Sequence, residues 1–456
     1  MKNISPQRQP LLIIFFTLII ALSFSLLPQG MKIGSYELKH VDLLIDVKPY
    51  EDIPVSGLFN GMPSANASVA GPEELARLLN NLFGPEANVP IQNAGSYLFG
   101  DTKQLSYFLD ALKSARGQAV RIAHYGDSAI EGDLISADLR EGLQSKFGGS
   151  ALGHLGIVSQ DITFRTTIKH SFSPEKTWET ASIYSSNLKG FPLGISGEAV
   201  IPKGGSWVRY EITRAQKSLR EFNTVRLFYT NAKNSSIKVY FNDASAPKSF
   251  NLTSGAGVKE LVIKSDGPAK SVKLEFPEKD QAYLFGISLE NGPGVYVDNF
   301  PLRGNSGIDI QKIPAATLKE YTKYFDYKLF ILEFGLNLVG QQNYDFYERE
   351  MGKVISLIRS AYPKASILLV SVHDKSIKQG SNFVTDPSVL KLLQTQKNIA
   401  SKNNVALFNL FDAMGGQNSM PKWVKGNPPL ASADYVHFNI LGAKKVSDLL
   451  IQSLIK

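Results

Sequence analysis

Short apolar runs alternate with helical periodicities in two distant parts of the chain. The first part holds an apolar run at residues 120–123 and a helical pattern at 134–147. The second holds apolar runs at 329–334, 366–372 and 405–410, and helical patterns at 344–362, 387–401 and 441–454. Apolar strands that alternate with amphipathic helices predict an α/β domain, with a parallel sheet covered by helices on both faces.

The stretch between these parts has a different pattern. Six strand-like segments follow one another without a helical period of useful length, at 208–212, 225–229, 237–241, 260–264, 272–276 and 283–289. Gly, Asn, Asp, Ser and Pro separate them, which is typical of turns between antiparallel strands. We therefore predict an all-β sandwich at residues 151–294, inserted between the two parts of the α/β domain, 101–150 and 295–456.

The N-terminal part begins with an apolar stretch. Residues 11–27 carry no charge, and Lys2 and Arg8 precede them. A stretch of 17 uncharged, mostly apolar residues is at the lower limit for a membrane-spanning helix, and the basic flank predicts a cytoplasmic N-terminus. We expect residues 1–29 to be an inner-membrane anchor, with a cleaved signal segment as the alternative, and the body to be periplasmic or secreted. Residues 30–100 are predicted to be a stalk and lead-in region.

Composition narrows the chemistry. The 456 residues include no cysteine, which excludes a cysteine nucleophile, disulfides and thiolate metal sites. The net charge of +8 is interspersed along the chain and favours a solvated surface. No segment is similar to a nucleic-acid-binding module, the histidine and carboxylate spacing predicts no metal site, and no cofactor is expected.

A serine stands at a predicted strand-to-helix turn. Gly126, Asp127 and Ser128 follow the apolar run at 120–123, so the hydroxyl can project above the sheet. A serine nucleophile needs a base, and that base needs an orienting carboxylate. Asp434 precedes His437 by three residues in a loop before the last predicted helix, a spacing that lets the carboxylate reach back to the imidazole.

Two glycine-containing turns offer hydrogen-bond donors. Gly304, Asn305, Ser306 and Gly307 form a turn in which the backbone can approach a ligand. Asn337 follows the apolar run at 329–334, which places an amide side chain at the carboxyl end of a strand. Sites in parallel sheets gather at those ends, so both turns are candidates for binding a developing negative charge.

Taken together, the four segments resemble the SGNH hydrolases, also called the GDSL esterases, in order and local context. The resemblance implies a flavodoxin-like three-layer α/β/α fold. It implies that Ser128 is the nucleophile, His437 the base and Asp434 its orienting acid. It also implies an oxyanion hole formed by the N–H groups of Ser128 and Gly307 and the side chain of Asn337.

The sequence departs from the family pattern at two places. The third segment often reads Gly-x-Asn-Asp, whereas Leu338 follows Asn337 here. The missing aspartate has no role in the triad, so each required role is still filled. Gly304 competes with Gly307 for the oxyanion position, and the small residue before Gly307 fits the family pattern better.

Ser128 and Gly307 are 179 positions apart, and this long interval is the second point of resemblance, because bacterial peptidoglycan O-acetylesterases have a sandwich there. That layout implies an esterase acting on an O-acetylated polysaccharide, peptidoglycan first. The alternatives are an O-acetyltransferase with the same triad and a glycan-binding protein with an idle one. Trp178 and Trp207 are candidates for stacking on sugar rings, and His373 for bordering the substrate pocket.

Overall fold

The computed structural model describes residues 97–185, 188, 190–233, 235–279 and 282–455, and two short strands that precede them. These two, β1 (Lys32–Ile33) and β2 (Tyr36–Glu37), pair antiparallel within a separate unit, Met1–Ala87. The predicted anchor and nearly all of the predicted stalk lie outside the described residues. Among the described residues, no helix has the length and apolar character needed to cross a membrane.

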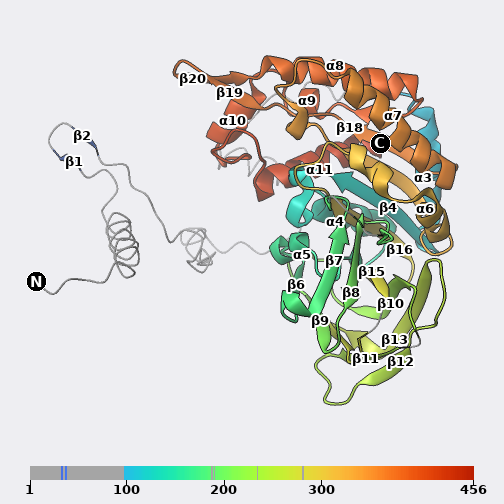
Figure 1. Ribbon diagram of the computed structural model, residues 1–456. Helices are drawn as coiled ribbons and strands as arrows, with labels where there is room; N and C mark the ends of the chain where they lie inside the picture. The colour runs from blue at the N-terminus through green and yellow to red at the C-terminus, as the bar shows by residue number, and fades with distance from the viewer. Residues whose placement is uncertain are drawn as a thin grey trace, which may run out of the picture. The chain divides into compact units, whose positions relative to one another are not determined.

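A six-stranded sheet forms the centre of the α/β domain (Figure 1). Its strands, in spatial order, are β16 (Gly294–Pro301), β4 (Ala119–Gly126), β17 (Tyr327–Glu333), β18 (Ser366–Val370), β21 (Ala406–Phe408) and β3 (Leu98–Gly100). The first five are parallel, and β3 is an antiparallel edge strand. The parallel strands have the flavodoxin-like order 2-1-3-4-5, which confirms the predicted fold class.

Helices cover both faces of this sheet because alternate strand residues point to opposite sides. In β17, Leu329 and Ile331 contribute to one hydrophobic core, whereas Phe330 and Leu332 contribute to the other. The first core includes residues of α3 (Ser106–Leu112), α4 (Ser136–Phe147) and α11 (Ile440–Leu454). The second includes residues of α6 (Ala315–Tyr321), α7 (Asp345–Ala361) and α8 (Pro387–Lys402).

The strands between α4 and β16 form two antiparallel sheets with a third core between them. One sheet has the order β13 (Lys259–Ala269), β10 (Phe222–Thr230), β15 (Tyr283–Glu290), β8 (Glu198–Pro202), β7 (Trp178–Ser182), with β5 (Gly153–Leu155) also paired to β15. The other is β12 (Lys248–Asn251), β11 (Ser236–Phe241), β14 (Ser271–Phe276), β9 (Ser206–Ile212), β6 (Ile168–Phe172). These antiparallel sheets fit the predicted inserted sandwich.

The sandwich and the α/β domain share a buried junction. Phe228 and Phe285, from β10 and β15, lie in the same core as residues of α6 and α7. Arg121 of β4 pairs with Glu290 at the end of β15 and lies 3.4 Å from Asp298 of β16. A buried charge pair is costly to break, so this contact holds the insert against the sheet that carries the candidate site.

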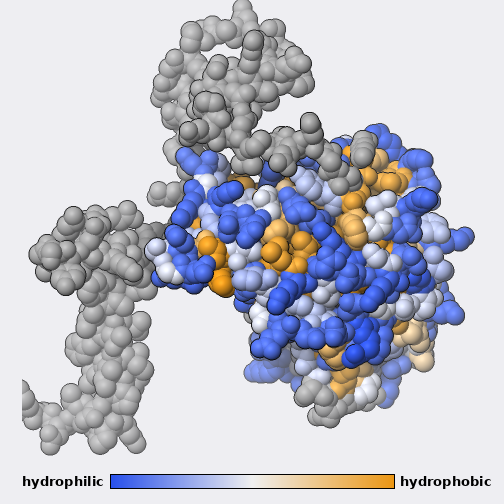
Figure 2. Space-filling model, turned by 90° about the horizontal axis from the view of Figure 1, so that it is seen from above, coloured by the Kyte–Doolittle hydropathy of each residue, from blue (hydrophilic) through white to orange (hydrophobic). Residues whose placement is uncertain are grey.

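The surface on the side of α8 is mainly hydrophilic. Figure 2 shows that hydrophobic groups on this face form small clusters between hydrophilic residues, apart from the atoms drawn in grey. The large exposed hydrophobic residues of the described chain come from several different elements, among them Phe99, Phe346 and Leu390. Isolated apolar side chains of this kind are usual on a surface that faces water.

Candidate active site

The nucleophile turn is built by three consecutive residues at the end of β4. Ser128 opens the 3-10 helix η4 (Ser128–Asp133), and the carboxylate of Asp127 accepts a hydrogen bond from Ala129 N at 3.0 Å. Gly126 allows close packing at this turn, because an added Cβ would lie 2.9 Å from the side chain of Ile130 and 3.0 Å from Glu333 O. This local packing leaves Ser128 half-buried at the sheet edge.

The structure brings Ser128, His437 and Asp434 into one hydrogen-bonded chain. Ser128 Oγ lies 3.1 Å from His437 Nε2, and His437 Nδ1 lies 2.7 Å from Asp434 Oδ2. Because a carboxylate only accepts, Nδ1 carries the proton that it donates to Asp434. Nε2 is then the acceptor for the serine hydroxyl, which is the arrangement that a general base requires.

The loop that holds His437 is fixed by its own backbone. Asp434 Oδ1 accepts from the N–H groups of Val436 at 2.9 Å and His437 at 3.0 Å. Tyr435 adopts a positive φ of 60°, and its ring stacks on Phe383 with 3.6 Å between ring centroids. The imidazole is therefore positioned before any substrate binds, which reduces the entropic cost of reaching the reactive geometry.

Hydrogen bonding keeps Asp434 ionised. Partial burial by itself would raise its pKa, but the hydrogen bonds from the His437 side chain and from the backbone of His437 and Val436 lower the pKa below the usual aspartate value. The side chains of His437 and Asp434 remain 43% and 46% exposed. The pair is thus open to solvent and to a bulky substrate.

Asn337 connects the other predicted donors. It lies in the 3-10 helix η7 (Leu336–Leu338) that follows β17, and its Nδ2 donates to Asn305 O at 2.9 Å. The same nitrogen lies 3.5 Å from Asp127 Oδ2, next to the nucleophile. Asn337 therefore links the segment of Ser128 to that of Gly307, so the structure brings all four predicted segments together.

Gly307 occupies a position that only glycine can fill, although its N–H is engaged. Its φ is 88°, and an added Cβ would lie 2.6 Å from the ring of Phe334. The N–H donates to the side chain of Asn305, two residues earlier, at 2.7 Å. To donate to an oxyanion, Gly307 has to share or release this bond, whereas Ser128 N–H donates to no backbone carbonyl among the described residues.

The location of the site follows from the topology. β16, β4 and β17 are neighbouring parallel strands, and Gly307, Ser128 and Asn337 each come shortly after one of them. The strand order reverses beside β4, and such a switch point opens a crevice at the carboxyl ends of the strands. Three segments distant in sequence therefore meet at one edge of the sheet, and the loop before α11 supplies the histidine.

The carboxyl group of Asp127 is buried beneath the nucleophile. Burial, the largest cause, and the charge of nearby Glu333 raise its pKa to about 7, against hydrogen bonds from the N–H groups of Ala129, Gly335 and Leu336. Glu333 in turn pairs with His124, with Nε2 and Oε2 3.0 Å apart. Folding thus forces Asp127 towards its neutral form at a pH where an unfolded aspartate is ionised.

Asp127→Asn is expected to flatten the pH dependence of stability. Because the folded pKa is raised, the stability that Asp127 contributes is full below pH ~4 and is lost as pH rises through about 7. Between pH ~4.5 and ~7.5 the wild-type loss of unfolding free energy should exceed the variant's by on the order of 3 kcal/mol. Asparagine can still cap Ala129 N, so the fold is preserved.

Urea unfolding of both proteins at the two pH values measures this difference. Asp266→Asn is the control, because its side chain is 90% exposed on the sandwich. Equal pH dependence in wild type and Asp127→Asn would contradict the burial argument.

The structure contradicts two of the predicted substrate contacts. Trp178 is only 3% exposed and packs into the sandwich core, with its ring 5.8 Å from that of Phe276. His373 is 2% exposed and packs on Phe438, with ring centroids 4.3 Å apart. Both predictions are wrong, because a side chain inside a core offers no face to a sugar.

Trp207 remains a candidate, since it is only partly buried in β9. The ammonium of Lys273 lies 5.0 Å from its ring centroid. A sugar that stacks on this face therefore has to share it with a cation.

Tyr184 is a residue near the site that no sequence pattern indicated. It stands in a turn after β7, where Tyr184 N donates to Ser182 Oγ at 3.3 Å and Ser185 N donates to Ser182 O at 2.9 Å. Lys312, in the 3-10 helix that Gly307 caps, donates to Ile183 O at 2.6 Å. The sandwich thus extends a turn to the segment that carries the predicted oxyanion donor.

The electrostatic surroundings of the Tyr184 phenol are acidic. Burial raises the pKa of its phenol, and the nearby charges of Glu198, Asp309, Glu131 and Asp127 raise it further. This 50% exposed ring belongs to the turn that contacts the segment of Gly307. A loop position outside any strand or helix leaves no periodicity from which such a residue could be predicted.

The described residues contain no candidate metal site. No group of three or more histidine or acidic side chains is placed to hold an ion there.

A comparison with solved structures supports the fold. A structure described as a peptidoglycan O-acetylesterase in action is similar to this chain, with a TM-score of 0.65 and 20% sequence identity, over 78% of this chain and 98% of that one. No protein-family model and no curated protein matches the sequence.

Two other solved structures are similar over smaller regions. An acetyl xylan esterase, AlAXEase, has 18% identity and a TM-score of 0.28, over 35% of this chain and 82% of that one. A family two carbohydrate esterase from Cellvibrio japonicus has 10% identity and a TM-score of 0.23, over 63% and 98%.

Proposed function

We propose that the chain is a serine esterase that removes O-acetyl groups from a cell-envelope polysaccharide, with peptidoglycan the first candidate. The observation that carries the proposal is the hydrogen-bonded chain from Ser128 Oγ through His437 to Asp434 at the switch point of the sheet. The fold shared with a peptidoglycan O-acetylesterase supports it. The apolar segment at residues 11–27 supports a place at the periplasmic side of the inner membrane.

The proposed reaction begins at the serine. Ser128 Oγ attacks the acetyl carbonyl carbon while His437 Nε2 takes the hydroxyl proton, and Asp434 stabilises the imidazolium. The carbonyl oxygen becomes an oxyanion beside Ser128 N–H and Asn337 Nδ2. The C–O bond to the sugar then breaks, and the sugar oxygen takes the proton from His437, which leaves an acetyl group on Ser128.

Water completes the cycle. His437 takes a proton from the water as the water oxygen attacks the acetyl carbon. The second tetrahedral intermediate then releases acetate, and Ser128 Oγ recovers its proton from His437. The half-exposed triad allows a polymer-bound ester to reach the serine.

Acetate release tests the proposed function. The purified full-length chain is incubated with O-acetylated peptidoglycan strands and, in parallel, with O-acetylated xylan. Faster acetate release from peptidoglycan supports the proposal, and faster release from xylan moves the substrate to another polysaccharide. Acetylation of an added glycan acceptor without acetate release would make the protein a transferase, and no turnover at all would leave a glycan-binding protein.

Asn337→Ala is expected to lower kcat for an aryl acetate by about 10²–10³-fold, because one oxyanion donor is lost. KM should change little, since the bond to Asn337 strengthens only as charge develops in the transition state. The control is Gln342→Ala, another exposed amide a few residues later. A rise in KM with an unchanged kcat would assign Asn337 to substrate binding instead.

A further inference from the structure

The sandwich contains a cleft of about 660 Å³ that the triad does not use. It is lined in part by residues of β8 and of the loop after β10. Volumes of this size are typical of sites for small molecules or for one or two sugar units. The aromatic and charged side chains of its lining are Phe191, Tyr283, Lys203, Lys279, Lys233 and Glu179.

Two of the lysines stand directly opposite each other. Lys203 and Lys279 form an isolated antiparallel bridge, and side chains at such paired positions point to the same face. Both side chains are exposed, and neither has an ion pair in the described part of the chain. Like charges in this arrangement repel each other, so an anion placed between them would relieve the repulsion.

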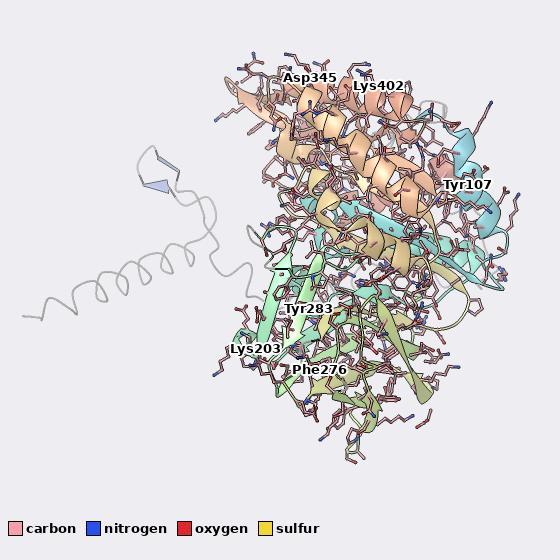
Figure 3. The ribbon with its side chains drawn as sticks, turned by 45° about the vertical axis from the view of Figure 1, so that its right-hand side comes forward. Tyr107, Lys203, Phe276, Tyr283, Asp345 and Lys402 are labelled. Atoms are coloured by element: carbon pink, nitrogen blue, oxygen red, sulfur yellow. The ribbon has the colours of Figure 1, made fainter. Side chains whose placement is uncertain are left out.

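The aromatic pair lines the same cleft. Tyr283 and Phe191 meet edge to face, with ring centroids 5.0 Å apart. Figure 3 shows Tyr283 and Lys203 close together on the sandwich. A half-buried ring next to these ammonium groups suits a sugar that has an apolar C–H face and a negative substituent.

The cleft also adjoins the junction with the α/β domain. Phe285, which points to the same face of β15 as Tyr283, is part of the core shared with that domain. Phe191 belongs to the same connection between β7 and β8 as Ile183, whose carbonyl accepts from Lys312 of the α/β domain at 2.6 Å. One loop of the sandwich therefore lines the cleft and also contacts the segment that follows Gly307.

We propose that this cleft is a subsite for a carboxylated sugar unit of the polysaccharide substrate. Lys203 and Lys279 bind the carboxylate, Tyr283 and Phe191 stack on the ring, and Glu179 accepts from a sugar hydroxyl. The identity of the polymer that binds here rests on the proposed function. Binding of the sugar unit in the subsite makes or breaks no covalent bond. Its role is to hold a chain whose acetylated unit is presented to Ser128.

Binding is measured by calorimetry in the full-length chain carrying Ser128→Ala, so that turnover plays no part. The probes are peptidoglycan glycan strands freed of stem peptides, which carry lactyl carboxylates, oligogalacturonate, which carries uronic carboxylates, and neutral xylo-oligosaccharide. Lys203→Ala/Lys279→Ala is expected to weaken binding of at least one acidic probe about tenfold and to reduce its salt dependence. Which acidic probe responds identifies the source of the carboxylate.

The matched control is Arg214→Ala/Arg220→Ala. These residues line a larger and also basic cleft, of about 1200 Å³, elsewhere on the sandwich. The proposal is supported if the control variant binds the acidic probe with an affinity within twofold of that of the Ser128→Ala parent. Equal losses in both double variants would mean unspecific charge attraction, and no loss in the lysine variant would mean that the cleft is not the site; either result overturns it.

Two further measurements separate a loss of binding from misfolding and from a change in catalysis. Lys203→Gln/Lys279→Gln, compared by thermal unfolding, shows whether a loss comes from misfolding, since glutamine keeps most of the side-chain bulk. The Lys203→Ala/Lys279→Ala variant that keeps Ser128 should hydrolyse a small aryl acetate at the same rate as wild type. An inactive wild type with intact lysine-dependent binding would refute the proposed esterase and leave the subsite standing.

Discussion

Replacing Ser128 with alanine is expected to lower kcat/KM for 4-nitrophenyl acetate by at least about 10⁴-fold. Alanine has no hydroxyl, so the attack is lost and His437 Nε2 has no proton to accept from residue 128. The donors at Asn337 and the backbone remain, which explains why some acceleration over water should persist. Initial rates at neutral pH measure the loss.

A covalent label distinguishes a nucleophile from a residue that only binds. A fluorophosphonate reagent should add one phosphonyl group to Ser128 in wild type and none in Ser128→Ala, as read by mass spectrometry of the peptides. Ser145→Ala is the control, because that hydroxyl donates to Gly142 O on the exposed side of α4. A Ser128→Ala variant with activity within tenfold of wild type would refute the proposed mechanism.

The sequence predicts the α/β domain well because its strands are buried on both faces. The runs around Val120, Leu329 and Ser366 are mostly apolar, with Arg121 and Glu333 as single charged exceptions, and the structure confirms strands there as β4, β17 and β18. The apolar pattern does not predict β16, because Asp298 and Asn299 interrupt it. Both are buried by contacts with other elements, since Asp298 accepts from Tyr327 at 2.7 Å and Asn299 accepts from Ser136 at 2.8 Å.

The meeting of the site residues was predictable for a topological reason. Ser128 and Asn337 each follow an apolar run, and the carboxyl ends of parallel strands share one edge of the sheet. The engagement of Gly307 by Asn305 was not predictable, because it depends on the local backbone of one turn. The roles of these residues stay predictions until the variants are measured.

The substrate side of the site is the hardest part to predict from sequence. Trp178 and Tyr184 are six residues apart, yet one lies in a core and the other is half-exposed. Alternation along a strand shows that its two faces differ but not which of them is covered. Only the packing of the sandwich against the α/β domain decides that, and this packing depends on contacts between distant segments.

Asp434→Asn is expected to lower kcat by about 10⁴-fold while KM stays nearly unchanged. In wild type, Asp434 accepts from His437 Nδ1 at 2.7 Å, so the imidazole leaves Nε2 free to accept the proton of Ser128. An asparagine amide can donate to Nδ1 instead, which favours the tautomer with its proton on Nε2. That imidazole can no longer act as the base.

The expected split between kcat and KM separates positioning from binding, because Asp434 contacts the histidine and not the substrate. Steady-state kinetics with an aryl acetate gives both constants, and thermal unfolding checks that the loop is intact, since asparagine can still accept from the backbone of Val436 and His437. Asp448→Asn, in the next helix, is the matched control, because its carboxylate pairs with exposed Lys444. A large rise in KM, or a kcat within tenfold of wild type, would mean that His437 takes its orientation from elsewhere and that the triad is incomplete.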